Sequence, residues 1–284
     1  VPETPRWLLS KGRLKECRKV LQKIEPENTV NDLIGQMEVE IEKDRNSAVG
    51  WRYLMQPWLR TPLMIAVCIM FFQQFVGINT VIYYSPKIFL MAGFESTLSA
   101  IWASVGIGIV NVVFTVISLY LVDRIGRRKL YFIGLSGIAF SVLCLSACFI
   151  YANQLGEIGR WLMVIFMFGY VAFFAISIGP LGWLVISEIF PQKVRGLGTS
   201  IGSLAVWIFN CIVSFTFFKI IDFFSIPGTE IVVGQTTSEN PAGAFFLYGF
   251  IAVLGLVWGY LFLPETKGLS LEEIEQKWRK NREC

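Results

Sequence analysis

The sequence predicts an all-α integral membrane protein with six transmembrane helices and short cytoplasmic helices before them. Its composition is 54% hydrophobic and only 16% charged, with 24 Phe and 9 Trp in 284 residues, which is too apolar for one soluble domain of this length. A helical span needs about 20 mostly apolar residues. Such stretches lie near 62–90, 98–122, 130–152, 161–187, 197–221 and 243–263.

One short phrase stands at both ends of this region. Pro2-Glu3-Thr4 opens the chain, and Pro264-Glu265-Thr266 follows the last apolar stretch. A motif that follows one run of membrane helices should also follow an earlier run. We therefore expect the chain to be the second half of a duplicated membrane protein, with a first half upstream.

Residues 1–60 are charged and amphipathic, and we interpret them as short cytoplasmic helices. Turns are expected at Gly12, Pro26 and Asn31-Asp32. One apolar stripe with helical spacing would let this segment lie against a bundle or a membrane surface. The stripe contains Ile34, Met37 and Ile41.

The first span carries an unusual set of polar residues, namely Gln73, Gln74, Asn79, Tyr83 and Tyr84. Polar groups in lipid must find partners. Gly77 and Pro86 weaken helix continuity here, and transporters place substrate at discontinuous helices near the midplane. The alternative is that these side chains only join neighbouring helices by hydrogen bonds.

The fourth span contains Gly179-Pro180, which predicts a bend, followed by Trp183. This order favours a cavity-lining or gating role for Trp183 over a place in the interfacial aromatic belt. Three residues of other spans extend the candidate set, each being as compatible with helix packing as with a site. They are Asn111, Trp207 and Asn210.

No span has an acidic or basic residue at its middle, although such residues are the usual mark of ion pathways. Neutral amides and aromatic rings instead fit an uncharged, polyhydroxylated ligand, because amides both donate and accept hydrogen bonds and aromatic faces pack on sugar C–H surfaces. Any proton-carrying carboxylate is therefore expected in the upstream half.

Lys and Arg alternate between the two sides of the membrane, and loops rich in them stay cytoplasmic. They are concentrated in 1–60, the Asp123–Lys129 loop, the Glu188–Arg195 loop and the tail. Only Lys87, Arg160 and Lys219 lie near the other connections. Both termini are thus expected in the cytoplasm, and the net charge of +4 indicates topology rather than nucleic-acid binding.

The remaining connections predict little chemistry. The polar loop Ser225–Gly243 is assigned no structure, and Ser270 with Glu273 forms a capping-box pattern that predicts a helix in the tail. The six Cys are expected as free thiols, and a chain without His shows no metal-ligand spacing. We expect no cofactor, no metal, no catalytic residues and no enzymatic activity.

Five motifs in this order resemble those of the sugar porters of the major facilitator superfamily, with wording most similar to the bacterial proton–sugar symporters. They are Gln73-Gln74 with Gly77, Asn79 and Tyr83-Tyr84; Asp123-Arg124 with Gly126-Arg127-Arg128; Gly179-Pro180 with Trp183; Glu188 with Pro191 and Arg195-Gly196; and Pro264 to Gly268. The resemblance implies a cytoplasmic helical linker at 1–60, helices seven to twelve at 61–264, and a cytoplasmic tail at 265–284.

The resemblance also implies roles for individual residues. Substrate contacts fall on Gln73, Gln74, Asn79, Asn111, Trp183 and Trp207. The gate falls on Tyr83, Tyr84, Gly179 and Pro180. A cytoplasmic charge network that locks the outward-facing state falls on Glu3, Arg6, Asp123, Arg124, Arg127, Arg128, Glu188, Arg195 and Glu265. Charges at helix ends are also consistent with topology signals or weak surface ion pairs, but their clustering with Gly126 and Gly196, which allow tight turns, favours the lock.

Two positions depart from the family pattern. Ala175 stands where animal glucose facilitators carry Glu, and in this departure the chain resembles the bacterial proton–sugar symporters. Val206 stands where many members carry Asn or Gln. The expected function is transport of a hexose or pentose by alternating access, with protons as the co-transported ion and with the lipid bilayer and the upstream six-helix half as partners, in a plasma or bacterial inner membrane. Uncoupled facilitated transport and a transporter-like sugar sensor remain the alternatives.

Overall fold

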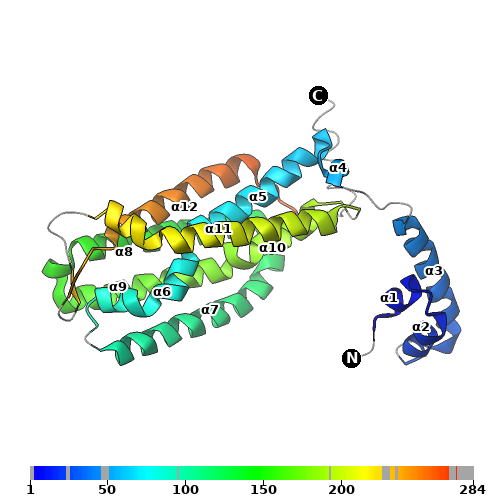
Figure 1. Cartoon of the computed structure of the whole chain (residues 1–284), viewed down its shortest axis with the longest axis horizontal. Coiled ribbons are helices and arrows are strands. Elements are labelled where there is room, and N and C mark those ends of the chain that lie inside the picture. The colour runs from blue at the N-terminus through cyan, green and yellow to red at the C-terminus, as the bar shows by residue number, and fades with distance from the viewer. Residues whose placement is uncertain are drawn as a thin grey trace. The chain divides into compact units, whose positions relative to one another are not determined.

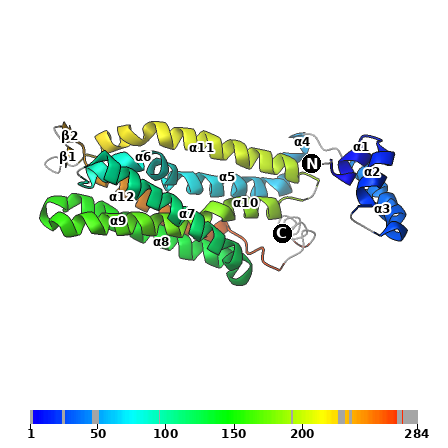
Figure 2. The ribbon, with the colours of Figure 1, turned by 90° about the horizontal axis from the view of Figure 1, so that it is seen from below.

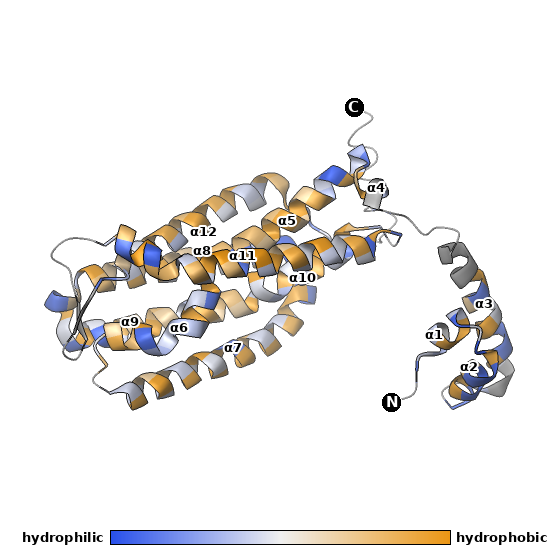
Figure 3. Ribbon diagram, in the orientation of Figure 1, coloured by the Kyte–Doolittle hydropathy of each residue, from blue (hydrophilic) through white to orange (hydrophobic). Residues whose placement is uncertain are grey.

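The computed structural model describes residues 3–23, 26–45, 51–94, 96–191, 193–225, 231–233, 236–268 and 273. It divides the chain into two compact units, Val1–Tyr53 and Leu54–Cys284 (Figure 1). Polar residues are frequent on the helices of the first unit, whereas apolar residues dominate those of the second (Figure 3). Each unit is described separately below.

The first unit contains α1 (Pro5–Ser10), α2 (Leu14–Leu21) and α3 (Glu27–Arg45). Thr4 caps α1 by accepting a hydrogen bond from the Trp7 N–H at 3.4 Å. The three helices enclose a small apolar core of Leu8, Cys17, Leu21, Val30 and Ile34. Burial raises the pKa of the Cys17 thiol, which therefore remains protonated at neutral pH.

The turn predicted at Asn31-Asp32 is wrong, because α3 continues through both residues. The Asn31 side chain accepts a hydrogen bond from Arg18 Nη2 at 2.8 Å. Its amide is thus engaged with α2 and does not compete with the backbone of α3, which is the usual reason for Asn to favour turns.

The short helix α4 (Trp51–Leu54) follows α3 at the boundary of the two units. The later helices build the membrane region. They are the 3₁₀ turn η1 (Pro57–Leu59), α5 (Arg60–Phe75), α6 (Ile78–Met91), α7 (Thr97–Ile125), α8 (Arg127–Ile150), α9 (Ala152–Ile176), α10 (Ile178–Ile189), α11 (Arg195–Phe223) and α12 (Ala242–Phe262). They form six apolar spans, of which Pro57–Met91 and Ala152–Ile189 each combine two helices. The prediction of six transmembrane helices is confirmed.

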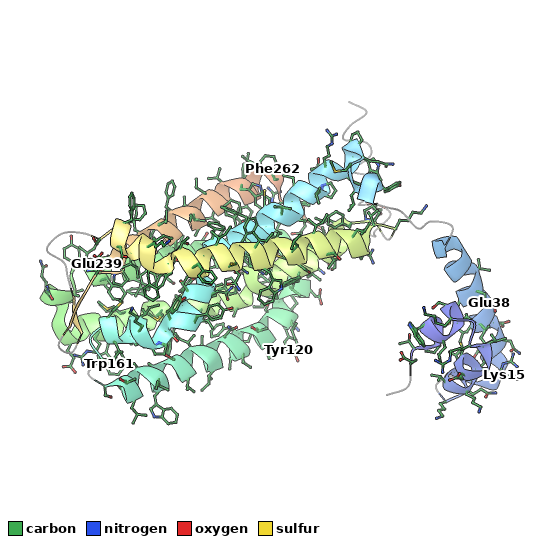
Figure 4. All side chains as sticks on the ribbon, viewed as in Figure 1. Lys15, Glu38, Tyr120, Trp161, Glu239 and Phe262 are labelled. Atoms are coloured by element: carbon green, nitrogen blue, oxygen red, sulfur yellow. The ribbon has the colours of Figure 1, made fainter. Side chains whose placement is uncertain are left out.

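Within this unit α8 packs against α9 and α12, α7 against α9 and α6, and α5 against α11 (Figures 1 and 2). Small residues permit the closest approaches. A Cβ atom on Gly259 of α12 would lie 2.4 Å from the Tyr131 ring of α8. The outer faces are apolar and open, and Tyr120 of α7 and Phe262 of α12 point away from the bundle (Figure 4), as expected of helices in lipid.

In the membrane region the structure differs from the sequence-based prediction in three further places. First, α9 begins at Ala152 rather than at 161 and contains a kink at Gly156. Second, α6 continues through Pro86. The missing N–H of Pro86 would have bonded the Ile82 carbonyl, which instead accepts a hydrogen bond from Ser85 Oγ at 3.4 Å.

Third, the loop between α11 and α12 was assigned no structure, and this is wrong. It contains an antiparallel pair of strands, β1 (Ile231–Val233) and β2 (Thr236–Ser238). The helix predicted in the tail at Ser270 lies outside the described residues, apart from Glu273.

Candidate functional site

Two of the six spans are interrupted, and both interruptions face one region of the bundle. Between α5 and α6 the chain turns at Gly77, whose φ of +87° is left-handed. Between α9 and α10 it turns at Ser177, with φ −128° and ψ −104°. The bend predicted at Gly179-Pro180 thus lies slightly earlier, at Ser177. Pro180 belongs to the first turn of α10, where its missing N–H removes no helical hydrogen bond.

Three amide side chains form a directional hydrogen-bonded chain between these breaks. Asn79 Nδ2 donates to Gln74 Oε1 at 2.6 Å, and Gln74 Nε2 donates to Gln73 Oε1 at 3.4 Å. Gln73 Nε2 then donates to the carbonyl oxygens of Ile178 and Gly179 at 3.1 and 2.7 Å. Because carbonyl oxygens only accept, the NH₂ end of Gln73 must face them, and this sets the direction of the whole chain.

The direction of the chain determines what each amide offers to a ligand. Both N–H groups of Gln73 are engaged, so Gln73 presents only its oxygen. Gln74 and Asn79 each keep one N–H group and lone pairs on their oxygens. The site therefore offers both donors and acceptors, which is the pattern that hydroxyl groups require.

A pocket of about 290 Å³ lies beside the amide chain, at the lower end of the roughly 300–1,000 Å³ typical of small-molecule sites. It brings together seven predicted residues, namely Gln73, Gln74, Asn79, Asn111, Gly179, Pro180 and Trp183. Five further residues complete the lining, namely Ile78, Thr115, Phe174, Ala175 and Val206. No charged side chain is among them, and polar and apolar walls face the same small volume.

Ile78, Thr115 and Phe174 were not predicted. Thr115 lies one helical turn after Asn111 and donates to its backbone oxygen at 2.7 Å, so helical spacing from Asn111 could have found it. Ile78 and Phe174 are apolar residues within apolar spans, and such residues carry no signal that separates a pocket wall from a lipid-facing position.

Trp207 is not brought into this pocket. The lining residue on this part of α11 is its neighbour Val206, while Trp207 itself is 65% exposed. Successive residues of a helix point about 100° apart, and on this part of α11 only Val206 is among the residues that line the pocket.

The predicted gate tyrosines lie against α11 instead of in the pocket. Tyr83 Oη accepts a hydrogen bond from Asn210 Nδ2 at 3.3 Å. Tyr84 Oη donates to the Ser214 carbonyl at 3.3 Å, and its ring stacks on Phe217 with centroids 5.5 Å apart. These contacts hold α6 beside α11.

A charge cluster lies where α7 ends and α8 begins. Arg127 pairs with Glu188 of α10 at 2.8 Å and with Asp123 at 3.3 Å. Glu265 accepts hydrogen bonds from the backbone N–H groups of Arg127 and Arg128, at 3.0 and 3.1 Å, with one carboxylate oxygen each. The carboxylate thus caps the N-terminus of α8, where free N–H groups and the helix dipole favour negative charge.

The other members of the predicted charge network are placed less closely. Arg128 donates to the Tyr260 carbonyl at 2.8 Å, and the Arg124 carbonyl accepts from Lys267 Nζ at 2.7 Å. Arg195 Nε and Nη2 are buried and lack a hydrogen-bond partner among the described residues. Glu3 is an exposed residue of the first unit, and the side chain of Arg6 lies outside the described part.

The described residues contain no group of three or more His, Cys, Asp or Glu side chains placed to hold a metal ion. Their five cysteines, Cys17, Cys68, Cys144, Cys148 and Cys211, are free.

Comparison with known proteins identifies the family of the chain. Residues 1–278 match the family model described as "Sugar (and other) transporter". The chain is 34% identical over 278 residues to the D-xylose-proton symporter of Escherichia coli, covering 98% of this chain and 53% of that protein. It is 35% identical over 279 residues to the glucose transporter GlcP of Staphylococcus epidermidis, with 98% and 58% covered.

A solved structure gives the same result. The proton:xylose symporter XylE bound to 6-bromo-6-deoxy-D-glucose matches with a TM-score of 0.70 and 33% identity, covering 98% of this chain and 55% of that one. The chain thus spans about half the length of these relatives. All three are named as transporters or symporters, not as enzymes. The matched family model and the six apolar helices support the same assignment. This chain belongs to the sugar transporter family of the major facilitator superfamily and is an integral membrane protein.

Proposed function

We propose that this chain is the C-terminal half of a secondary active transporter that moves a hexose or pentose by alternating access, in symport with protons. The observation that carries the proposal is the uncharged pocket between the two helix breaks, where amides that donate and accept hydrogen bonds face an indole ring. The relatives named for xylose and glucose transport support a monosaccharide as the ligand.

The proposal assigns the pocket amides and Trp183 to direct contact with the sugar. Trp207, Tyr83 and Tyr84 act from outside the pocket described here, Trp207 as a further contact and the tyrosines as the outer gate. The pocket lining holds no ionisable side chain, so the proton carrier belongs to the N-terminal six-helix half. The coverage of about half of each relative supports the existence of such a half.

We further propose that 1–60 is a cytoplasmic linker, 61–264 the bundle and 265–284 a cytoplasmic tail. The charged segments around Asp123–Lys129 and Glu188–Arg195 then face the cytoplasm with both termini, in a plasma or bacterial inner membrane. Pairing of their charges with the other half would stabilise the outward-facing state.

The full-length protein reconstituted in liposomes tests the function. Uptake of labelled glucose, galactose and xylose is measured with and without an imposed proton gradient, for the wild type and for Asn79→Ala. We expect gradient-driven accumulation of at least one sugar and its loss in the variant, because Asn79 anchors the open end of the amide chain.

Two other outcomes would select the alternatives. Sugar equilibration that ignores the gradient would indicate a uniporter, which the uncharged pocket also permits. Sugar binding without flux under any condition would indicate a sensor and contradict transport.

A further inference from the structure

The two helix breaks are connected by hydrogen bonds in both directions. Gln73 of α5 donates to the carbonyls of Ile178 and Gly179 at the start of α10. In return, Tyr170 of α9 donates from its hydroxyl to the Val76 carbonyl at 2.8 Å. Val76 lies between the end of α5 at Phe75 and the start of α6 at Ile78, so this carbonyl is at the first break itself.

We propose that Tyr170 and Gln73 form a reciprocal brace that makes the two helix breaks one mechanical unit, with Tyr170 acting as a positioning residue for the ligand pocket. Tyr170 does not line the pocket and is fully buried at 0% exposure. It acts through the Val76 carbonyl on the turn that separates Gln74 from Asn79. The positioning role of Tyr170 rests on the transport function proposed above, whereas the hydrogen-bonded brace does not.

The Tyr170 bond serves the Val76 carbonyl, which lies at the C-terminal end of α5. A carbonyl at this end of a helix lacks an intrahelical donor and needs one from elsewhere when it is buried. The Ile178 and Gly179 carbonyls lie at the start of α10, where the residue four positions later supplies a helical donor, so Gln73 adds a second hydrogen bond to each. Loss of the Tyr170 bond therefore removes the donor of a buried acceptor, and loss of the Gln73 bonds detaches α5 from the start of α10.

The chain offers a closely matched control. Tyr131 of α8 is also fully buried, and its hydroxyl also donates to a backbone carbonyl, that of Gly255, at 2.9 Å. Gly255 lies inside α12 and belongs to neither break. Tyr170→Phe and Tyr131→Phe therefore remove the same atom and the same kind of bond, but only the first removes the brace.

Hydrogen exchange of the full-length protein, without sugar, tests the brace directly. In Tyr170→Phe we expect backbone amides around both 76–80 and 177–181 to exchange roughly fivefold faster, from the loss of one hydrogen bond at a buried break. In Tyr131→Phe both segments should exchange as in the wild type. Faster exchange at 76–80 alone would overturn the brace, because the second break would then be independent of the first.

A double-mutant cycle adds the second direction. Gln73→Met keeps the length of the side chain but removes both donated hydrogen bonds. The effects of Gln73→Met and Tyr170→Phe on exchange should be non-additive if the breaks form one unit, and additive effects would contradict it.

Sugar titration separates this inference from the proposed function. For the same two tyrosine variants we expect Tyr170→Phe to weaken sugar binding about fivefold and Tyr131→Phe to leave it unchanged. Unchanged binding in Tyr170→Phe would refute the positioning role. Coupled exchange in a protein that binds no sugar would keep the brace and reject the proposed function.

Discussion

Gly77 shows how strictly single residues determine the site. Its left-handed φ of +87° disfavours any residue with a Cβ, and a Cβ here would lie 2.3 Å from the Tyr248 ring of α12. Both constraints act at the turn that separates Gln73 and Gln74 from Asn79. The position of the amide chain therefore depends on the absence of a side chain at this residue.

Gly77→Ala should lower the stability of the protein by about 2–4 kcal/mol, combining left-handed strain with overpacking. Gly93→Ala is the control, because Gly93 also has a positive φ, +92°, but its nearest neighbour, Arg160 Nε, would be at an ordinary 3.5 Å. Thermal unfolding in detergent measures both. Equal losses would show that the contact with Tyr248 contributes nothing.

Val206 gives a residue-scale prediction about ligand affinity. It lines the pocket without a hydrogen-bonding group, so Val206→Asn should tighten sugar binding by about fivefold, the effect of one added hydrogen bond. Val206→Leu has a similar size without the amide and should not tighten it. Identical affinities of the two variants, measured by equilibrium titration of the full-length protein, would disprove the prediction.

The polar residues of the site, together with Gly179, Pro180 and Trp183, could be predicted from the sequence, whereas its aliphatic and phenylalanine residues Ile78 and Phe174 could not. An amide such as Gln73 in an apolar span is conspicuous because lipid cannot satisfy it. Phe174 and Ile78 are ordinary in the same context, and only tertiary packing decides whether they face lipid, another helix or the pocket. Trp207 shows the converse, since a conspicuous residue lies outside the pocket.

At the scale of elements, α8 packs closely against the second break. Gly134 of α8 is so close to Ser177 that a Cβ would lie 1.7 Å from its hydroxyl oxygen. The Ser177 hydroxyl is itself engaged, donating to the Phe173 carbonyl at 2.6 Å. The end of α9 is therefore held directly against α8.

Gly134→Ala should consequently lower the melting temperature, with a cost of about 1–3 kcal/mol for overpacking. Gly108→Ala in α7 is the matched helical control, since nothing lies within 4 Å of the added atom and Ala is the better helix former. A melting temperature of Gly134→Ala equal to that of Gly108→Ala would contradict close packing at the break.

Element boundaries were predictable only where the local signal is decisive. The six spans follow from hydropathy alone. Helix continuation through Pro86 depends on Ser85 as a substitute donor to the Ile82 carbonyl, which composition does not reveal. The β1–β2 pair, by contrast, consists mostly of β-branched residues, Ile-Val-Val and Thr-Thr-Ser, so strand propensity could have predicted it.

For the membrane bundle as a whole, Glu265 connects the segment after α12 to the start of α8, while Arg127 connects α8 to Glu188 of α10. Arg127 is only 12% exposed, so its ion pair is less screened than a surface pair. The cluster thus joins distant parts of the chain at one end of the bundle.

Glu265→Gln should destabilise the bundle by about 1–2 kcal/mol, because an amide accepts with only one atom and carries no charge for the helix dipole. Glu157→Gln, at an exposed position of α9, removes the same charge without a cap. The thermal unfolding midpoints of the two variants, measured at the same salt concentration, test this prediction. Equal midpoints would show that Glu265 does not stabilise the bundle as a cap of α8.

The central claim is that the uncharged pocket between the two helix breaks binds a monosaccharide. Isothermal titration of the full-length protein with glucose, galactose and xylose tests it most directly, comparing Trp183→Leu with Trp161→Leu, a variant of an outward-pointing tryptophan of α9 (Figure 4). We expect binding of at least one sugar to the wild type and to Trp161→Leu, and its loss in Trp183→Leu. Absence of binding to the wild type, or equal binding to both variants, would contradict the claim.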